Sequence, residues 1–134
     1  MSTYAIIQSL LDTQLQSLSG LPPLQLENTV NIGKTGVSFS RATLLPAAKS
    51  QASVGISGQD LIRGIYQVDL FVPQDTGSAS VNALADSVVD HFPRGLALAS
   101  GEVVVHINTA SRLTGGRMEP FYSVPVQVQW SCIA

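Results

Sequence analysis

The N-terminal segment has the hydrophobic spacing of an amphipathic helix. Between residues 2 and 19, large apolar residues recur every three or four positions, which places them on one side of a helix. These residues are Ile7, Leu11, Leu15 and Leu18, with Ile6 and Leu10 beside them. Gly20 can close the helix in a left-handed conformation, and the prolines at 22 and 23 forbid its continuation. The pattern therefore predicts a first helix.

The same spacing returns between residues 78 and 92 and predicts a second helix. Its apolar positions follow the helical period without a miss: Val81, Leu84, Ala85, Val88, Val89 and Phe92. Ser78 or Ser80 can supply the capping oxygen, and Pro93 ends the helix at or before Phe92. A large buried side chain contributes about 1.5–3 kcal/mol, so this stripe is sufficient to dock the helix on a sheet.

Most of the remaining chain alternates between apolar and polar residues, as strands with one buried face do. The clearest strand covers residues 60–73, with Tyr66, Val68, Leu70 and Val72 on one face. Residues 120–132 alternate almost as regularly. Pro125 lies within that segment and predicts an edge strand or a bulge there, because proline cannot donate to a strand ladder. Residues 96–108 predict two strands joined by a turn at Ser100-Gly101.

Residues 24–30 and 37–45 predict two further strands, which a turn at Gly33–Gly36 joins as a hairpin. Gly33-Lys34-Thr35 has the form of the end of a phosphate-binding loop. The first glycine of that motif would fall at position 28, which is asparagine, and the following residues alternate like a strand instead of forming a helix. The segment therefore favours a glycine turn and not a nucleotide site.

These elements predict a single α+β domain over residues 1–134, with the main elements in the order α-β-β-β-α-β-β. Short connections between successive strands imply a mostly antiparallel sheet with the two helices packed on one face. The other face carries Gln, Ser, Asp and Arg beside Ile and Phe, so it is either solvated or in contact with another subunit. Residues 46–60 are rich in Ser, Ala and Gly and predict one long loop, which at this length is typically functional or disordered.

The chain carries few charges, and the charges are scattered. Charged residues make up 12% of the 134 residues, about half of the ~25% that is usual. Depletion of charge is typical of the core of protein interfaces. The seven Lys and Arg form no basic run, which argues against a nucleic-acid-binding surface. No apolar stretch approaches the ~20 residues of a membrane span, and residues 1–20 lack the features of a signal peptide.

No pattern of reactive residues indicates catalysis or metal binding. His91 and His106 lack the spacing of metal ligands, and a histidine at the end of a helix is explained by the helix dipole. No serine has a nucleophile-elbow context. Cys132 is the only cysteine and shows no sign of activation; it excludes an internal disulfide and favours a reducing cytosol. We expect no enzyme activity, no metal and no cofactor.

Three segments, GIYQVDLFVPQDTGSASVNALADSVVDHFPRG, SGEVVVHI and FYSVPVQVQW, together resemble the tail terminator (tail completion) proteins of long non-contractile-tailed bacteriophages and related tail-like particles. The shared scheme is a strand that ends near Pro73, a small-residue loop with Gly77 and an amphipathic helix. The helix ends in an aromatic residue followed by Arg94-Gly95, and two strands with a terminal aromatic, Trp130, come after it. The resemblance covers nearly the whole chain.

The resemblance implies a structural virion protein. Such proteins form a hexameric ring that caps the tail tube, stops its polymerisation and presents a surface for head attachment. The implied partners are further copies of the chain, the tail tube protein and a head completion or connector protein. DNA passes through the lumen without specific binding, which a nearly neutral chain suits. The implied location is the head–tail junction of the virion, after assembly in the host bacterial cytoplasm.

Five residues are the candidates for subunit or tube contacts. Lys49, Val54 and Ile56 lie in the predicted loop, where the two apolar residues can anchor a neighbour. Arg63 and Arg112 are candidates for ion pairs between subunits, because arginine suits interface pairs better than lysine. Solubility and ordinary surface pairs are the more common explanation for the five arginines of the chain, and the excess of arginine over lysine supports ion pairs between subunits only weakly.

Other functions fit the same pattern. The chain could be another connector or neck ring protein, or a tube subunit; electron microscopy separates these, because a cap gives single rings and a tube protein gives filaments. A different class is a small-ligand or peptide-binding α+β domain, which needs a concave apolar pocket with converging polar groups. An enzyme is the third alternative.

Overall fold

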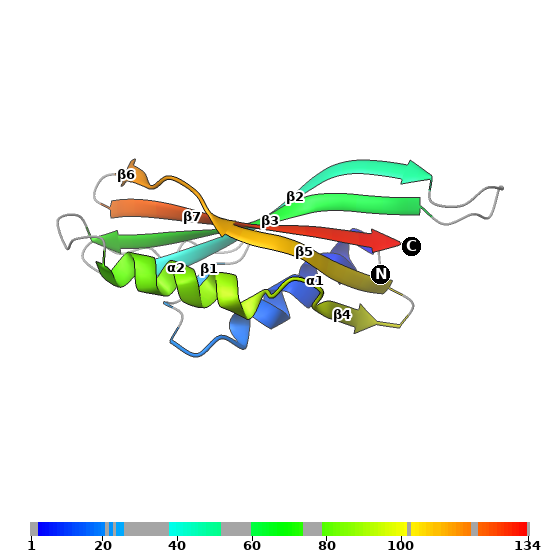
Figure 1. Ribbon diagram of the computed structural model, residues 1–134, viewed down its shortest axis with the longest axis horizontal. Coiled ribbons are helices and arrows are strands. Elements are labelled where there is room, and N and C mark those ends of the chain that lie inside the picture. Colours follow the sequence, from blue (N-terminus) through cyan, green and yellow to red (C-terminus); the bar gives the residue numbers. More distant parts are fainter. Residues whose placement is uncertain are drawn as a thin grey trace.

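A computed structural model describes residues 3–20, 22, 24–25, 38–51, 60–73, 79–101, 103–118 and 121–133. Over these residues the chain forms one twisted sheet, and helices α1 (Thr3–Gln16) and α2 (Ala79–His91) both lie on the same face of it (Figure 1). The strands are β1 (Leu24–Gln25), β2 (Phe39–Gln51), β3 (Asp60–Pro73), β4 (Ala97–Ser100), β5 (Val103–Arg112), β6 (Gly116–Met118) and β7 (Phe121–Ile133). The predicted α+β class is confirmed.

The strands lie in the order β1-β2-β3-β7-β5-β4, and β6 pairs with the start of β7. Every described pair is antiparallel except β1 with β2, which is parallel. The predicted hairpin between residues 24–30 and 37–45 is therefore wrong, because a tight turn cannot join parallel neighbours. The expected turn at Gly33–Gly36 lies outside the described residues. The two strands predicted over residues 96–108 are confirmed as β4 and β5, whereas the short strand β6 was not predicted.

The predicted loop at 46–60 is wrong at its N-terminal end. β2 continues to Gln51, so strand covers residues 46–51 of that segment, whereas β3 begins at Asp60 as predicted. The register between the two strands shifts between Pro46 and Lys49, which is a bulge. This part of β2 is rich in Ser, Ala and Lys and shows no alternation of apolar residues in the sequence, because an edge strand needs fewer apolar residues than a central one. Residues 52–59 lie outside the described part of the chain.

One main core fills the space between the helices and the sheet. The predicted stripe of α1 is confirmed, since Ile7, Leu11 and Leu15 are fully buried. The stripe of α2 is confirmed by the burial of Val81, Ala85, Val88 and Phe92. The predicted inner face of the last strand is buried at Val124, Val126, Val128 and Trp130. Tyr66 on β3 is buried as well, and its hydroxyl donates a hydrogen bond to Asp12 on α1.

The C-terminal ends of the two helices are joined by hydrogen bonds. The side-chain amide of Gln14 donates to the carbonyl oxygen of His91 over 2.8 Å, and Nε2 of His91 lies 2.7 Å from the carbonyl oxygen of Gln14. Because a carbonyl oxygen only accepts, Nε2 carries the hydrogen. Ser17 Oγ lies 2.7 Å from the same nitrogen. The half-buried His91 thus bridges α1 and α2.

Pro125 lies in a central strand, so the predicted edge position is wrong. The Leu113 amide donates to the Pro125 carbonyl oxygen over 2.9 Å, which shows that the backbone polar groups of Pro125 face the side of β5. There β5 has ended at Arg112 and β6 has not yet begun, so the missing N–H removes no bond to β3. The Leu113 carbonyl accepts instead from Arg112 Nη1 over 3.1 Å. Because no described strand pairs with β7 on that side of Pro125, proline is tolerated there as it is in an edge strand.

We predict that Gly64→Ala destabilises the fold. Gly64 on β3 pairs with Trp130 on β7, and an added Cβ would lie 2.6 Å from Trp130 Cζ2 and 2.8 Å from the Leu45 backbone oxygen. Overpacking of this kind costs about 1–3 kcal/mol in the free energy of unfolding, measured by urea denaturation. Gly116→Ala is the matched control, because a Cβ there meets no atom within 4 Å. Equal stability of both variants would contradict the packing.

Candidate functional site

The sheet face away from the helices carries a connected row of polar side chains. Arg41 Nη2 lies 3.2 Å from Asp69 Oδ2 and forms an ion pair. Gln67 donates from its amide to the other carboxylate oxygen of Asp69 over 2.9 Å, and Gln127 donates to Gln67 over 3.4 Å. The Asp69 residue is only 6% exposed, so its charge is compensated where it is buried. The result is a polar surface over β2, β3 and β7 with little net charge.

Three phenylalanines form a second, smaller core beside this row. Phe39 and Phe71 stack with ring centroids 4.5 Å apart, and Phe121 meets Phe39 edge-on at 5.2 Å. The guanidinium of Arg41 lies 5.0 Å from the centroid of the Phe71 ring. An arginine over an aromatic face is attracted by the ring quadrupole. Arg41 is therefore engaged within the chain.

A hollow lies on the same face near the end of the sheet where β2 finishes and β3 starts. Its volume is about 420 Å³, and its lining includes Ala47, Leu61, Arg63, Ile65, Asn108 and Gln129. Leu45, which pairs with Ile65, is 43% exposed. Arg63, Asn108 and Gln129 are exposed too. The hollow thus combines apolar residues with solvated polar groups, as the rim of a protein contact does.

The structure separates the five predicted contact residues. Lys49 lies on β2 opposite Ile62, next to the position of Arg63 on β3, so these two belong to the same end of the sheet. Arg112 ends β5 beside Val126, further along the sheet, and is exposed. Val54 and Ile56 lie outside the described residues. The hydrogen bond from Arg112 to the Leu113 carbonyl leaves the rest of its guanidinium free of any described carboxylate.

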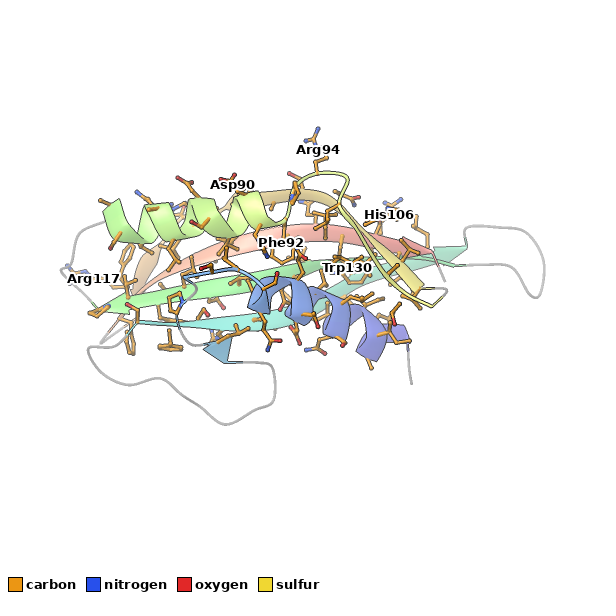
Figure 2. The ribbon with its side chains drawn as sticks, turned by 90° about the horizontal axis from the view of Figure 1, so that it is seen from below. Asp90, Phe92, Arg94, His106, Arg117 and Trp130 are labelled. Atoms are coloured by element: carbon orange, nitrogen blue, oxygen red, sulfur yellow. The ribbon has the colours of Figure 1, made fainter. Side chains whose placement is uncertain are left out.

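A groove between α2 and β5 was not predicted. Its volume is about 310 Å³, and it is lined by Val89, Asp90, Phe92, Pro93, Arg94, Thr109 and Ala110. In Figure 2, Phe92 points toward the sheet, whereas Arg94 projects outward from the turn after α2. The groove follows the outer edge of β5, which β4 covers only up to His106. Strand order creates this feature, and a pattern along the sequence does not reveal strand order.

Two kinds of feature are absent from the described part of the chain. No group of three or more His, Cys, Asp or Glu residues there is arranged to hold a metal ion. None of the described helices is both long enough and apolar enough to span a membrane. Cys132 is buried in the core on β7, and this burial raises the pKa of its thiol above the ordinary value.

Comparison with known proteins identifies the family. The family described as "Phage tail terminator protein" matches residues 5–130. One solved structure, 25% identical in sequence, superposes with a TM-score of 0.76 and covers 98% of this chain and 96% of that chain. No curated protein matches the sequence.

The chain therefore belongs to the phage tail terminator family, and the resemblance seen in the sequence is confirmed. It is a structural protein of a phage tail, its place is in the tail of the virion, and it interacts with tail components.

We predict that Arg41→Gln destabilises the chain more than the double variant Arg41→Gln/Asp69→Asn. The single change leaves the buried Asp69 carboxylate without its cation. An unpaired buried polar group costs about 1–3 kcal/mol, and the second change removes the charge that needs compensation. Urea denaturation of the two variants, with Asp69→Asn completing the double-mutant cycle, measures the coupling. Additive effects of the two changes would contradict a structural role for this pair.

We predict that Cys132 lowers stability at alkaline pH. The pKa of its thiol is raised in the folded state, so the unfolded chain loses this proton first. The thiol's contribution is fully present below the unfolded pKa of about 8.5 and is lost as pH rises toward the folded value, with a slope of up to about 1.4 kcal/mol per pH unit. The difference in unfolding free energy between the natural chain and Cys132→Ala should shrink from pH 8 to pH 10. A constant difference would argue against burial of the thiol.

Proposed function

We propose that this chain assembles into a closed ring that caps the tail tube, ends its polymerisation and presents the surface for head attachment. The observation that carries the proposal is the family match over residues 5–130. The resemblance to tail terminator proteins implies a ring of six copies. Each copy is a single domain that catalyses no reaction. Assembly takes place in the host bacterial cytoplasm, and the ring then remains at the head–tail junction.

The helix-free face of the sheet is the surface that suits the lumen. Its central side chains are amides, hydroxyls and the internally compensated pair of Arg41 and Asp69. DNA that must pass through a ring should meet few free cations, because neutralised phosphates hold a nucleic acid in place. Arg63 is an exposed cation near one end of this face that forms no ion pair with another described residue of its own chain, and we assign it to an ion pair with a neighbouring copy.

The end of the sheet formed by the finish of β2 and the start of β3 is the part that suits contacts with the tube or a neighbour. It carries Lys49 and Arg63, the exposed Leu45 and the hollow beside Ile65. Residues 52–59, with Val54 and Ile56, connect the two strands there. A ring can close when one patch on each copy binds a different patch on the next copy. The same patch can cap the tube if the tube subunits present a complementary surface.

We predict that replacing residues 52–59 by Asn-Gly leaves the fold intact and abolishes capping. Two residues of this type can link Gln51 and Asp60, which are already paired across β2 and β3. Tails from phage that carry this variant should resemble tails from phage that lack the chain: tubes of uncontrolled length without heads. Electron microscopy measures tube length and head attachment, and the double variant Val54→Ser/Ile56→Ser tests the two apolar residues alone.

The reference phage without the chain separates the possible failures. Normal tube length and head attachment in its absence would overturn the proposed function. Uncontrolled tubes in its absence, together with normal tails from the Asn-Gly variant, would overturn only the assignment of residues 52–59. Filaments formed by the purified chain, in place of single rings, would identify it as a tube subunit.

A further inference from the structure

Within the described part of the chain, each outer edge of the sheet has a short window that no strand covers. On one side, β4 pairs with β5 as far as His106, and Leu96 bonds to Ile107; beyond that point no described strand covers residues 108–112. On the other side, β1 pairs only with Ser40 and Arg41 of β2, so no described strand covers β2 from Ala42 onward. An uncovered edge is a template for pairing with another strand.

The direction of the backbone polar groups on β5 follows from one hydrogen bond. The Leu113 amide donates to the Pro125 carbonyl oxygen, so residue 113 faces β7. Successive residues of a strand direct their N–H and C=O groups to alternate sides. The backbone groups of Ala110 and Arg112 therefore face the open edge.

The same alternation, carried across the sheet, fixes the direction of the groups on β2. Pro125 faces β5, so Val126 faces β3 and meets Val68, and Gln67 in turn faces Thr43 on β2. Ala42 and Leu44 consequently direct their N–H and C=O groups outward. Pro46 also faces outward, so its missing N–H blunts the edge at this point. The open window of β2 is thus residues 42–46.

We propose that β5 of one copy pairs with β2 of the next, with Ala110 opposite Leu44 and Arg112 opposite Ala42. The inference rests on the proposed ring and specifies how its subunits join. In this register residues 108–112 match residues 42–46, which are the two uncovered windows. In the copy that contributes β5, β4 lies beyond one end of the paired window. In the neighbour that contributes β2, β1 lies beyond the other end. The bulge after Pro46 turns the neighbour's β2 away before it would meet β4.

Strand direction and side-chain faces agree with this pairing. β2, β3, β7 and β5 alternate in direction, so a neighbour related by rotation about an axis along the strands places its β2 antiparallel to β5. Ala110 and Leu44 both face the helices, and both pack against the main core of their own copy. Ser111 and Thr43 both lie on the helix-free face. They extend the row of Gln67 and Gln127 from one copy to the next.

Cysteine cross-linking tests the register. In the double variant Thr43→Cys/Ser111→Cys, the two new cysteines of neighbouring copies stand directly opposite each other, within the Cα separation that a disulfide spans. Oxidised tails from phage carrying this variant should give a ladder of covalent oligomers on a non-reducing gel, ending at the ring size. Thr43→Cys/Thr109→Cys is the matched control; it places the second cysteine on the same face but two residues out of register, and it should cross-link at least tenfold less.

The possible outcomes separate a failure of the proposed β5–β2 pairing from a failure of the proposed ring. A closed oligomer seen by native mass spectrometry or electron microscopy, without cross-linking of the 43/111 variant, overturns the strand pairing and leaves the proposed function standing. Equal cross-linking of the control overturns the register. Absence of any ring from the tails overturns both proposals. Tails with the natural chain give the background level of cross-linking, because the buried Cys132 is not available at the new contact.

Discussion

The pairing of β3 with β7 is the constraint on which the rest of the structure depends. These strands pair along their whole length, from Leu61 opposite Ile133 to Pro73 opposite Phe121. Because side chains alternate along each strand, this one register decides which residues face the helices and which form the polar row. It also sets the alternation of backbone groups that reaches the two outer edges. If β3 kept its place, a slip of one residue would turn β7 over, which would expose Val126 and bury Gln127.

Residues with strong periodicity were predictable, and their partners were not. The stripes of both helices and the inner faces of β3 and β7 followed directly from the sequence, because burial on one side imposes a period on the side chains. Pro125 shows why partners escape such reasoning. Its sequence context indicates an edge, whereas the gap between β5 and β6, a feature of the assembled sheet, gives it a place in the centre. The parallel pairing of β1 was hidden for the same reason.

The candidate surfaces were less predictable than the fold. Charge depletion indicated contact surfaces, but it did not indicate which residues share one. The structure places Lys49 and Arg63 near each other and Arg112 apart from them, and it engages Arg41 within the chain. The groove beside α2 and the open edges had no sequence signal, since they arise where a neighbouring strand stops. The family, by contrast, was indicated by the resemblance of three segments to tail terminator proteins, and the family match over residues 5–130 confirms it.

The contact between Gly64 and Trp130 gives the molecule a natural optical probe. Trp130, labelled in Figure 2, is the only tryptophan of the chain, and its side chain is buried in the main core. Gly64, against which the indole packs, is also the β3 partner of Pro46, where the bulge of β2 begins. Intrinsic fluorescence therefore reports on one defined place, the base of the segment that we propose for contacts with the tube or a neighbour. Any shift of that segment when the protein meets its neighbours would change the emission without an added label.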